Sequence, residues 1–134
     1  MRSTLVARDT IDFIWPQIEK YILAAFSVPC DEPANSAIKD LYTGDAHLWV
    51  AHDRTGIKGA AIARLLILQN QKKIYQVVAC GGEDMPQWID CLRDIEKFAK
   101  QNGCKALRIS GRPGWKMLKN RGYAEPFVIL DKGL

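Results

Sequence analysis

Residues 85–102 form the segment that most constrains the fold of this chain, because apolar residues recur along it at the spacing of one helix face. The apolar positions are Trp88, Cys91, Leu92, Ile95, Phe98 and Ala99. Gly103 supplies a helix stop, and residues 104–110 follow as a short strand. An apolar segment, 73–80, precedes the helix, so the order strand, helix, strand predicts a parallel crossover unit.

Three apolar segments predict an antiparallel meander, and the last of them is the first strand of the crossover unit. Residues 47–52 and 57–68 are joined by Asp-Arg-Thr-Gly at 53–56, which is strong turn chemistry for a hairpin. Polar residues 69–72 then lead into 73–80. We therefore expect a mostly antiparallel sheet that continues into one parallel pair.

The N-terminal part is expected to begin with a short strand at residues 3–7 and a helix. Asp9 or Thr10 can cap that helix, and Pro16 is expected in its first turn. Its apolar positions at helical spacing are Ile14, Ile18, Tyr21, Ile22 and Ala25.

Four further segments complete the predicted order. Residues 28–33 are expected to form a loop and 34–42 a second helix, which Thr-Gly-Asp at 43–45 stops. Near the end of the sequence, a short helix at 114–121 ends at Gly122, and 127–130 is expected to be the last strand.

The composition, 48% hydrophobic and 25% charged, is that of an ordinary globular protein, and we expect one domain over residues 1–134. The longest apolar stretch, 60–68, is interrupted by Arg64 and is far shorter than the roughly 20 residues of a membrane-spanning helix. The first residues lack a secretory pattern. These features favour a cytoplasmic protein without membrane contact.

Neither the thiols nor the imidazoles form a recognisable metal motif. His47 and His52 lie five apart on a predicted strand, so they should face opposite sides of it. The wide spacing of the cysteines favours reduced structural thiols over a zinc site. The four cysteines are Cys30, Cys80, Cys91 and Cys104.

Positive charge is concentrated toward the end of the sequence. Residues 105–121 hold 6 basic and no acidic residues, whereas residues 1–60 hold 6 basic and 8 acidic residues. Such a segment can attract phosphate or nucleic acid, although a solvated basic face is the more common explanation.

The predicted order of elements resembles the GNAT N-acetyltransferase fold over nearly the whole chain. Residues 98–109 are similar to that family's helix end and following strand, and residues 118–123 are similar to its short helix closed by glycine and an aromatic residue. The resemblance implies an α/β (α+β) domain with a mixed, mostly antiparallel sheet flanked by helices on both faces.

Within that superfamily the chain looks most like small GNAT-like proteins of tailed bacteriophages or prophages. The shared features are the Ala-Cys-Gly-Gly turn at 79–82, Trp88 at the helix start, and Gly-Arg-Pro-Gly-Trp at 111–115. This resemblance implies a location in the host cytoplasm or in the virion, and phage structural or assembly proteins as partners.

The GNAT resemblance also assigns a coenzyme loop, and this chain departs from its pattern. Gln87 and Ile89 stand where glycines are expected to present amides to the acetyl-coenzyme A pyrophosphate. Pro86 removes an amide donor, and Glu83 and Asp84 bring negative charge to the same place.

Two alternatives remain for this loop. Gly81 and Gly82 could form a shifted anion-binding nest, with Arg112 or Lys116 neutralising the carboxylates. The simpler explanation is that Gly81 and Gly82 allow a tight turn.

The general acid of the family is often a tyrosine four residues before the closing glycine, and here that position is Leu118. Tyr123 is expected to pack in the core. The strand at 73–80 offers Tyr75 and Gln76 but no acidic residue. His47 and His52 remain candidate bases.

Trp88 and Trp115 each begin a predicted helix and could join Arg112 and Lys116 in an aromatic and basic surface for a partner protein. The leading hypothesis is a non-catalytic GNAT-fold phage protein that acts through protein contacts in a particle or its assembly. The alternative is an acetyl-coenzyme A-dependent N-acyltransferase with a shifted phosphate loop. Nucleic-acid binding by residues 105–121 is a third hypothesis. The sequence also allows a homo-oligomer.

Overall fold

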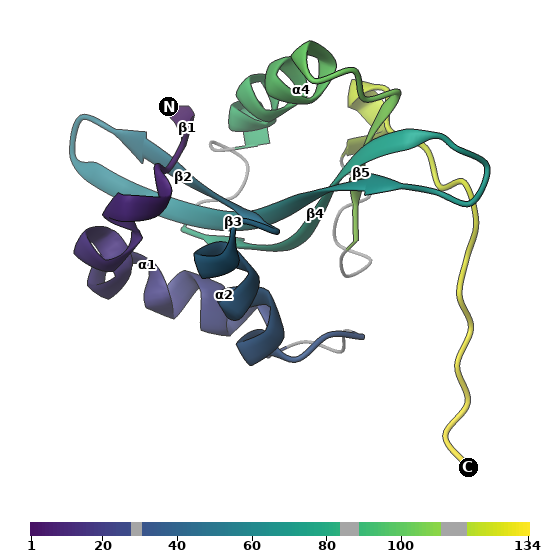
Figure 1. Ribbon diagram of the computed structural model, residues 1–134, viewed down its shortest axis with the longest axis horizontal. Coiled ribbons are helices and arrows are strands. Elements are labelled where there is room, and N and C mark those ends of the chain that lie inside the picture. The colour runs from purple at the N-terminus through teal and green to yellow at the C-terminus, as the bar shows by residue number, and fades with distance from the viewer. Residues whose placement is uncertain (28–30, 84–88, 111–117) are drawn as a thin grey trace.

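Five strands lie side by side in chain order in one sheet (Figure 1). The computed structural model describes residues 1–27, 31–83, 89–110 and 118–134. The strands are β1 (Arg2–Leu5), β2 (His47–Asp53), β3 (Gly56–Ile67), β4 (Lys73–Gly82) and β5 (Ala106–Ile109). The pairs β1–β2, β2–β3 and β3–β4 are antiparallel, whereas β4 and β5 are parallel. The predicted meander and parallel crossover are both confirmed.

The β2–β3 hairpin turns at Arg54 and Thr55, as the turn chemistry predicts. The Asp53 carboxylate accepts hydrogen bonds from the backbone N–H and the hydroxyl of Thr55, both through Oδ1. Gly56 closes the turn at φ 128°, a value that residues with a side chain rarely adopt.

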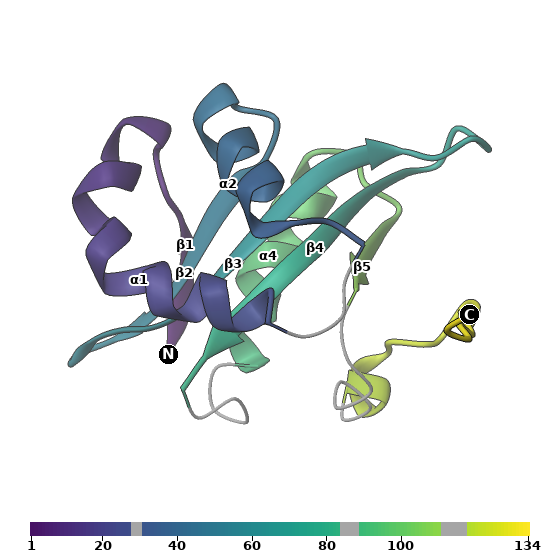
Figure 2. The same cartoon turned by 90° about the horizontal axis from the view of Figure 1, so that it is seen from below.

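Helices α1 (Ile11–Ala25) and α2 (Ala34–Thr43) cover one face of the sheet, as Figure 2 shows. A 3₁₀ turn, η1 (Arg8–Thr10), precedes α1. The expectation that Pro16 lies in the first turn is wrong, because α1 begins at Ile11 and Pro16 falls in its second turn. Gly44 ends α2 in the left-handed conformation at φ 87°, as predicted.

The core on this face is built from apolar side chains of both helices and of the three central strands. Its buried members include Ile11, Ile18, Ile22, Ala37, Leu41, Leu48, Val50, Ala60, Ile62 and Ala79.

Helix α4 (Leu92–Gln101) covers the opposite face, so the sheet lies between helices (Figure 1). A 3₁₀ turn, η2 (Ile89–Cys91), comes before it. The helix predicted at 85–102 is therefore confirmed over 92–101, whereas residues 89–91 are 3₁₀ and the predicted start at 85–88 lies outside the described residues. The predicted stripe packs as expected, with Leu92, Ile95 and Ala99 buried in this second core.

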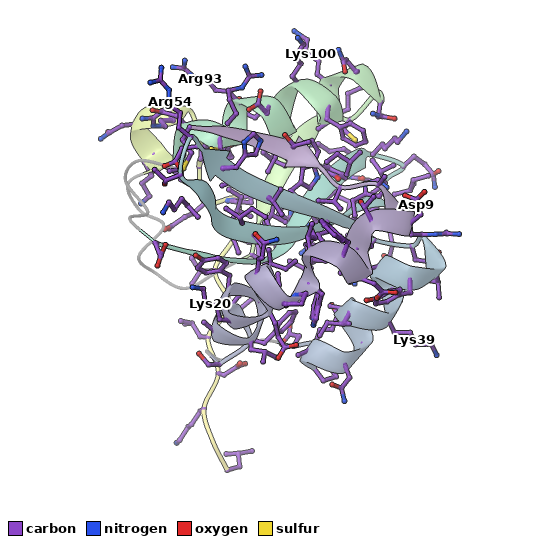
Figure 3. All side chains as sticks on the ribbon, turned by 90° about the vertical axis from the view of Figure 1, so that its left-hand side faces the viewer. Asp9, Lys20, Lys39, Arg54, Arg93 and Lys100 are labelled. Carbon is purple, nitrogen blue, oxygen red and sulfur yellow. The ribbon has the colours of Figure 1, made fainter. Side chains whose placement is uncertain are left out.

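Charged side chains of both helical layers lie on the outside of the molecule. Figure 3 shows Lys20 and Lys39 projecting from the α1–α2 side and Arg93 and Lys100 from the α4 side. Within the described residues, no helix is long and apolar enough to cross a membrane.

The segment 127–130 does not form the predicted last strand. It runs away from the body of the molecule (Figure 1), and its four side chains are at least 60% exposed. Its apolar sequence favours a strand, but a strand also needs hydrogen-bonding partners, and the described part of this chain places none beside it. Of the short helix expected at 114–121, residues 118–121 are described and form a 3₁₀ turn.

Candidate functional site at the open edge of β4

Strand β4 contains a bulge in its second half. Ile62 of β3 pairs with Ala79, and the next residue, Ala63, pairs with Val77, so Val78 is an extra residue in β4. As a result, Val78 and Ala79 both pack on the α1–α2 face, although they are consecutive. A bulge bends its strand and changes the direction of the residues that follow.

Beyond the bulge, the described residues give β4 a neighbouring strand on one side only. The pairing with β5 covers residues 74–77 of β4, and β5 ends at Ile109, while β4 continues to Gly82. Among the described residues, the backbone hydrogen bond nearest this end of the β4–β5 pair runs from the Ser110 N–H to the Val77 carbonyl, at 3.2 Å. We call residues 79–82 the open edge of β4.

One hydrogen bond shows to which side of the strand the backbone groups of the open edge point. The Glu83 N–H donates to the Lys58 carbonyl on β3. Backbone groups alternate sides along a strand, so those of Cys80 and Gly82 point the other way, toward the side that β5 no longer fills. Among the described residues, β5 offers nothing opposite them.

Side chains near this edge carry little acid–base chemistry. The Gln76 amide donates to the Ser110 hydroxyl at 2.6 Å where β4 and β5 begin to separate. From there to Gly82 the residues are Val, Val, Ala, Cys, Gly and Gly. Burial raises the pKa of the Cys80 thiol well above its ordinary value, so the thiol stays protonated and is a poor nucleophile.

Gly81 has a packing role. A Cβ at this position would overlap the carbonyl oxygen of Tyr21, so only glycine lets α1 lie this close to β4. Both Gly81 and Gly82 belong to β4. In a strand, successive N–H groups point to opposite sides, whereas a nest gathers them on one side. The coenzyme-binding role of Gly81 and Gly82 stays a prediction.

Negative charge lies directly after the open edge. Glu83 is exposed and follows the last residue of β4. The pKa of Tyr21 is raised, first by burial and then by its hydrogen bond to the Glu83 carboxylate. Glu83 is therefore oriented toward α1 at the point where the predicted coenzyme loop begins.

The family's general-acid position carries a core residue. Leu118 is 3% exposed and packs with Trp49, Tyr75 and Leu92 under α4. Tyr123 packs against the same core, which confirms its expected packing role, and its hydroxyl donates to Glu96 of α4 at 2.6 Å.

The two histidines lie at opposite ends of β2 and are not brought together. His47 Nδ1 lies 2.7 Å from the Tyr75 hydroxyl, and His52 Nε2 lies 2.7 Å from the Thr4 hydroxyl. Burial lowers the pKa of His47. Within the described ranges no group of histidine, cysteine and acidic residues could hold a metal ion.

Several predicted site residues lie outside the described residues. They are Cys30, Asp84, Pro86, Gln87, Trp88, Arg112, Trp115 and Lys116. The interaction surface predicted from Trp88, Arg112, Trp115 and Lys116 stays a prediction.

Sequence reasoning missed an ion-pair cluster around Arg64. The Arg64 guanidinium makes two hydrogen bonds of 2.9 Å to Glu32 and one of 2.9 Å to Asp40. Its side chain is 18% exposed. An arginine inside an apolar strand was the available signal, because such a residue is buried only with acidic partners. The cluster links both the segment before α2 and the second half of α2 to β3.

Comparison with solved structures gives close fold matches over nearly full length. One is a GNAT family acetyltransferase from Staphylococcus aureus, with a TM-score of 0.66, 16% identity, and coverage of 98% of this chain and 97% of that one. Another is a ribosomal-protein-alanine N-acetyltransferase from Brucella melitensis, with a TM-score of 0.69, 13% identity and full coverage of both chains.

The chain has the GNAT fold.

An aminoglycoside acetyltransferase from an uncultured soil sample, in complex with sisomicin, also matches, with a TM-score of 0.67, 12% identity, and coverage of 99% and 95%. A scan of protein-family models and a search of curated proteins found no match. At these identities the similarity shows the GNAT fold alone, and a fold does not determine the chemistry of its site.

Proposed function

We propose that this GNAT-fold protein acts through protein contacts and does not transfer acetyl groups. The observation that carries this proposal is that the open edge of β4 has no acid or base among its side chains. Leu118, at the expected general-acid position, is buried in the core.

Electrostatics support the same conclusion. A coenzyme pyrophosphate beside the end of the open edge would lie near Glu83, the residue that directly follows β4. At contact distance, a pair of like charges costs about 1 to 4 kcal/mol, depending on the local dielectric. Without compensating positive charge, the usual pose of the coenzyme is therefore disfavoured.

We assign the contacts to a structural or assembly protein of a tailed phage, with the chain in the host cytoplasm or in the particle. The predicted surface of Trp88, Arg112, Trp115 and Lys116 combines residue types that often anchor protein interfaces. Mass spectrometry of purified particles tests this assignment. Absence of the chain from particles, and from complexes isolated from infected cells, would contradict it.

Calorimetric titration with acetyl-coenzyme A tests the loss of coenzyme binding. We expect no heat of binding at acetyl-coenzyme A concentrations up to about 1 mM. A dissociation constant of that size corresponds to a binding free energy of about −4 kcal/mol. Replacing Glu83 with Gln removes the opposing charge without changing the strand, so any weak binding should strengthen in that variant. Gly81 is left intact because its substitution would displace α1.

The second candidate function is acetyl-coenzyme A-dependent N-acyl transfer with a shifted phosphate loop. It is favoured by one observation: the backbone groups of Cys80 and Gly82 face a side that the described part of β5 does not fill, and they could receive an extended ligand. Micromolar binding that is lost in Gly82→Val but kept in Gly133→Val would establish this alternative. A Cβ at Gly133 meets no atom within 4 Å, so that variant is a matched control.

Nucleic-acid binding by residues 105–121 is the third candidate function. Affinity for a mixed-sequence duplex that falls steeply between low and moderate salt would support it. Duplex binding that is undetectable at low salt would exclude it.

A further inference from the structure

Strand β3 continues beyond the start of β2, so its last residues lie at an edge of the sheet. The pairing of β2 with β3 reaches only to His47 opposite Ala63, whereas the pairing of β3 with β4 continues to Ile67 opposite Lys73. Figures 1 and 2 show the turn of the β3–β4 hairpin extending beyond the helices. We call residues 65–67 the hairpin edge.

The backbone groups of Leu65 and Ile67 point toward the side that β2 does not cover. The Leu68 N–H donates to the Lys72 carbonyl, so Leu68 faces β4. Backbone groups alternate sides along a strand, so those of Ile67 and Leu65 face away from β4. The Lys73 carbonyl, opposite Ile67, accepts a hydrogen bond on the β5 side, which agrees with this assignment. Among the described residues, no strand pairs with Leu65 or Ile67 on the outer side.

The side chains of the hairpin edge are apolar and partly or largely exposed. Ile67 is 70% exposed and Leu65 is 37% exposed. Both lie on the α4 face of the sheet, because Leu65 is opposite Tyr75, which is buried on that face. No residue in 65–67 carries a charge. Sheet edges are commonly protected by charged residues or proline, so an uncharged apolar edge is a site for pairing with another strand.

The two ends of the hairpin edge differ in charge. At the end near β2, Arg64 makes ion pairs with Glu32 and Asp40. The pKa of Arg64 is raised, chiefly by its hydrogen bond to Glu32, and the charge of nearby Asp45 adds to this effect. Three carboxylates around one guanidinium leave this end negative. At the other end, the turn carries two consecutive lysines and no acidic residue, and Lys72 is exposed.

We propose that the hairpin edge pairs with the same edge of a second copy of this chain, in an antiparallel dimer with two-fold symmetry. In this arrangement the basic turn of each copy approaches the acidic end of the other, whereas a parallel pair would bring like charges together. Because both charges belong to one edge, a second copy satisfies both ends at once. This inference goes beyond the proposed function and does not depend on coenzyme binding.

The start of β2 restricts the register of the pair. With Ile67 on the two-fold axis, Leu65 lies opposite Gln69 of the second copy, whose chain turns at that residue before it reaches β2. A register centred on Leu66 would instead place Gln69 of one copy where His47 of the other already pairs with β3. With Ile67 at the centre, the two Ile67 residues exchange N–H and carbonyl hydrogen bonds, and their side chains lie opposite each other.

Sedimentation velocity on the full chain, from micromolar to submillimolar concentration, tests the dimer. The dimer fraction of the wild-type chain is expected to rise over this range. Ile67→Pro removes an N–H that faces away from β4, so it should weaken the dimer by about tenfold or more while the hairpin persists. Ile67→Lys should also weaken it, whereas Phe13→Lys, at an 82% exposed position on α1, is the matched control. Far-ultraviolet circular dichroism checks that each variant is folded.

Charge reversal tests the antiparallel direction. Lys72→Glu and Asp45→Lys should each weaken the dimer, because each brings like charges together where the turn of one copy meets the acidic end of the other. The double variant restores opposite charges and should recover most of the lost affinity. Arg54→Glu, at the β2–β3 turn, changes the net charge by the same amount as Lys72→Glu and should leave the dimer unchanged.

Three results would overturn the proposal. The first is a wild-type chain that stays monomeric at submillimolar concentration, which would leave the hairpin edge to a strand of a different protein. The second is a dimer that both Ile67→Pro and Ile67→Lys leave intact. The third is a pair of charge reversals that do not compensate each other in the double variant.

Discussion

His47 Nδ1 lies 2.7 Å from the hydroxyl of Tyr75, a side chain that is 0% exposed. The same hydroxyl accepts a hydrogen bond of 2.9 Å from the Trp49 indole N–H. With the Trp49 N–H as donor, the Tyr75 O–H is free to donate to a neutral His47. Phe98 of α4 contacts all three rings, with centroid distances of 5.3 to 5.6 Å. One hydroxyl thus joins β2 to β4 beneath α4.

Replacing Tyr75 with Phe should destabilise the fold by about 1 to 3 kcal/mol, because it leaves the buried Trp49 N–H without its acceptor. Urea unfolding measures the change. Tyr42→Phe is the matched control, since the Tyr42 hydroxyl bonds Asp12 at the surface, and its effect should be smaller. Equal effects of the two substitutions would contradict the assigned importance of the buried hydroxyl.

Stability should fall as the pH drops below the ordinary pKa of histidine, and His47 should account for part of the loss. Burial lowers the pKa of His47 in the folded chain, so the unfolded chain binds the proton first. Stability is therefore full above the unfolded pKa, near 6.5, and is lost progressively below it. Unfolding free energies at pH 7.5 and 5 measure the dependence, which His47→Gln should flatten. If His47→Gln leaves the slope unchanged, this assignment is wrong.

Gly81→Ala should cost about 1 to 3 kcal/mol, because its Cβ would overlap the Tyr21 carbonyl and force α1 away from β4. Thermal unfolding, together with Gly133→Ala as the control with open space around the new Cβ, measures the effect. A neutral Gly81→Ala would show that α1 can shift freely and would remove the packing explanation for this glycine.

Arg64→Met should destabilise the chain by about 1 to 3 kcal/mol, since it removes the guanidinium shared by Glu32 and Asp40 and leaves the two carboxylates to repel. Arg64 lowers the pKa of Glu32, so this stabilisation is present at neutral pH and is lost as the pH falls through the folded pKa of Glu32. The two chains should therefore converge in stability in acid. Arg54→Met, at the exposed β2–β3 turn (Figure 3), should stay within about 0.5 kcal/mol of wild type.

Local patterns were sufficient to predict most of the fold. The turn at 53–56, the amphipathic stripe around Leu92 and Ile95, and the glycine after α2 each fix structure through neighbouring residues, and all three predictions are confirmed. The prediction of a strand at 127–130 is wrong, because neighbouring residues alone do not fix a strand. Its formation depends on a partner strand, which local sequence does not reveal.

The site was less predictable than the fold. The bulge at Val78 arises from the pairing of β4 with β3, and no residue type in 77–79 marks it. The absence of a tyrosine at position 118 could be read directly, and the burial of Leu118 agrees with that reading. The close approach of α1 to Gly81 involves a backbone oxygen, so no sequence pattern could have indicated it.

The attachment of β1 has a consequence for the nascent chain. Arg2 makes a two-pronged ion pair with Asp94, and the Ser3 N–H and hydroxyl bond the Asp94 carboxylate and the Cys91 carbonyl. A ribosome adding about 5 to 20 residues per second needs on the order of 5 to 20 s to reach Asp94 after Arg2 has been made. During that interval the first strand has no α4 to hold it. β1 therefore gains its contacts with α4 only after a segment 92 residues later has been made, although it can pair with β2 well before then.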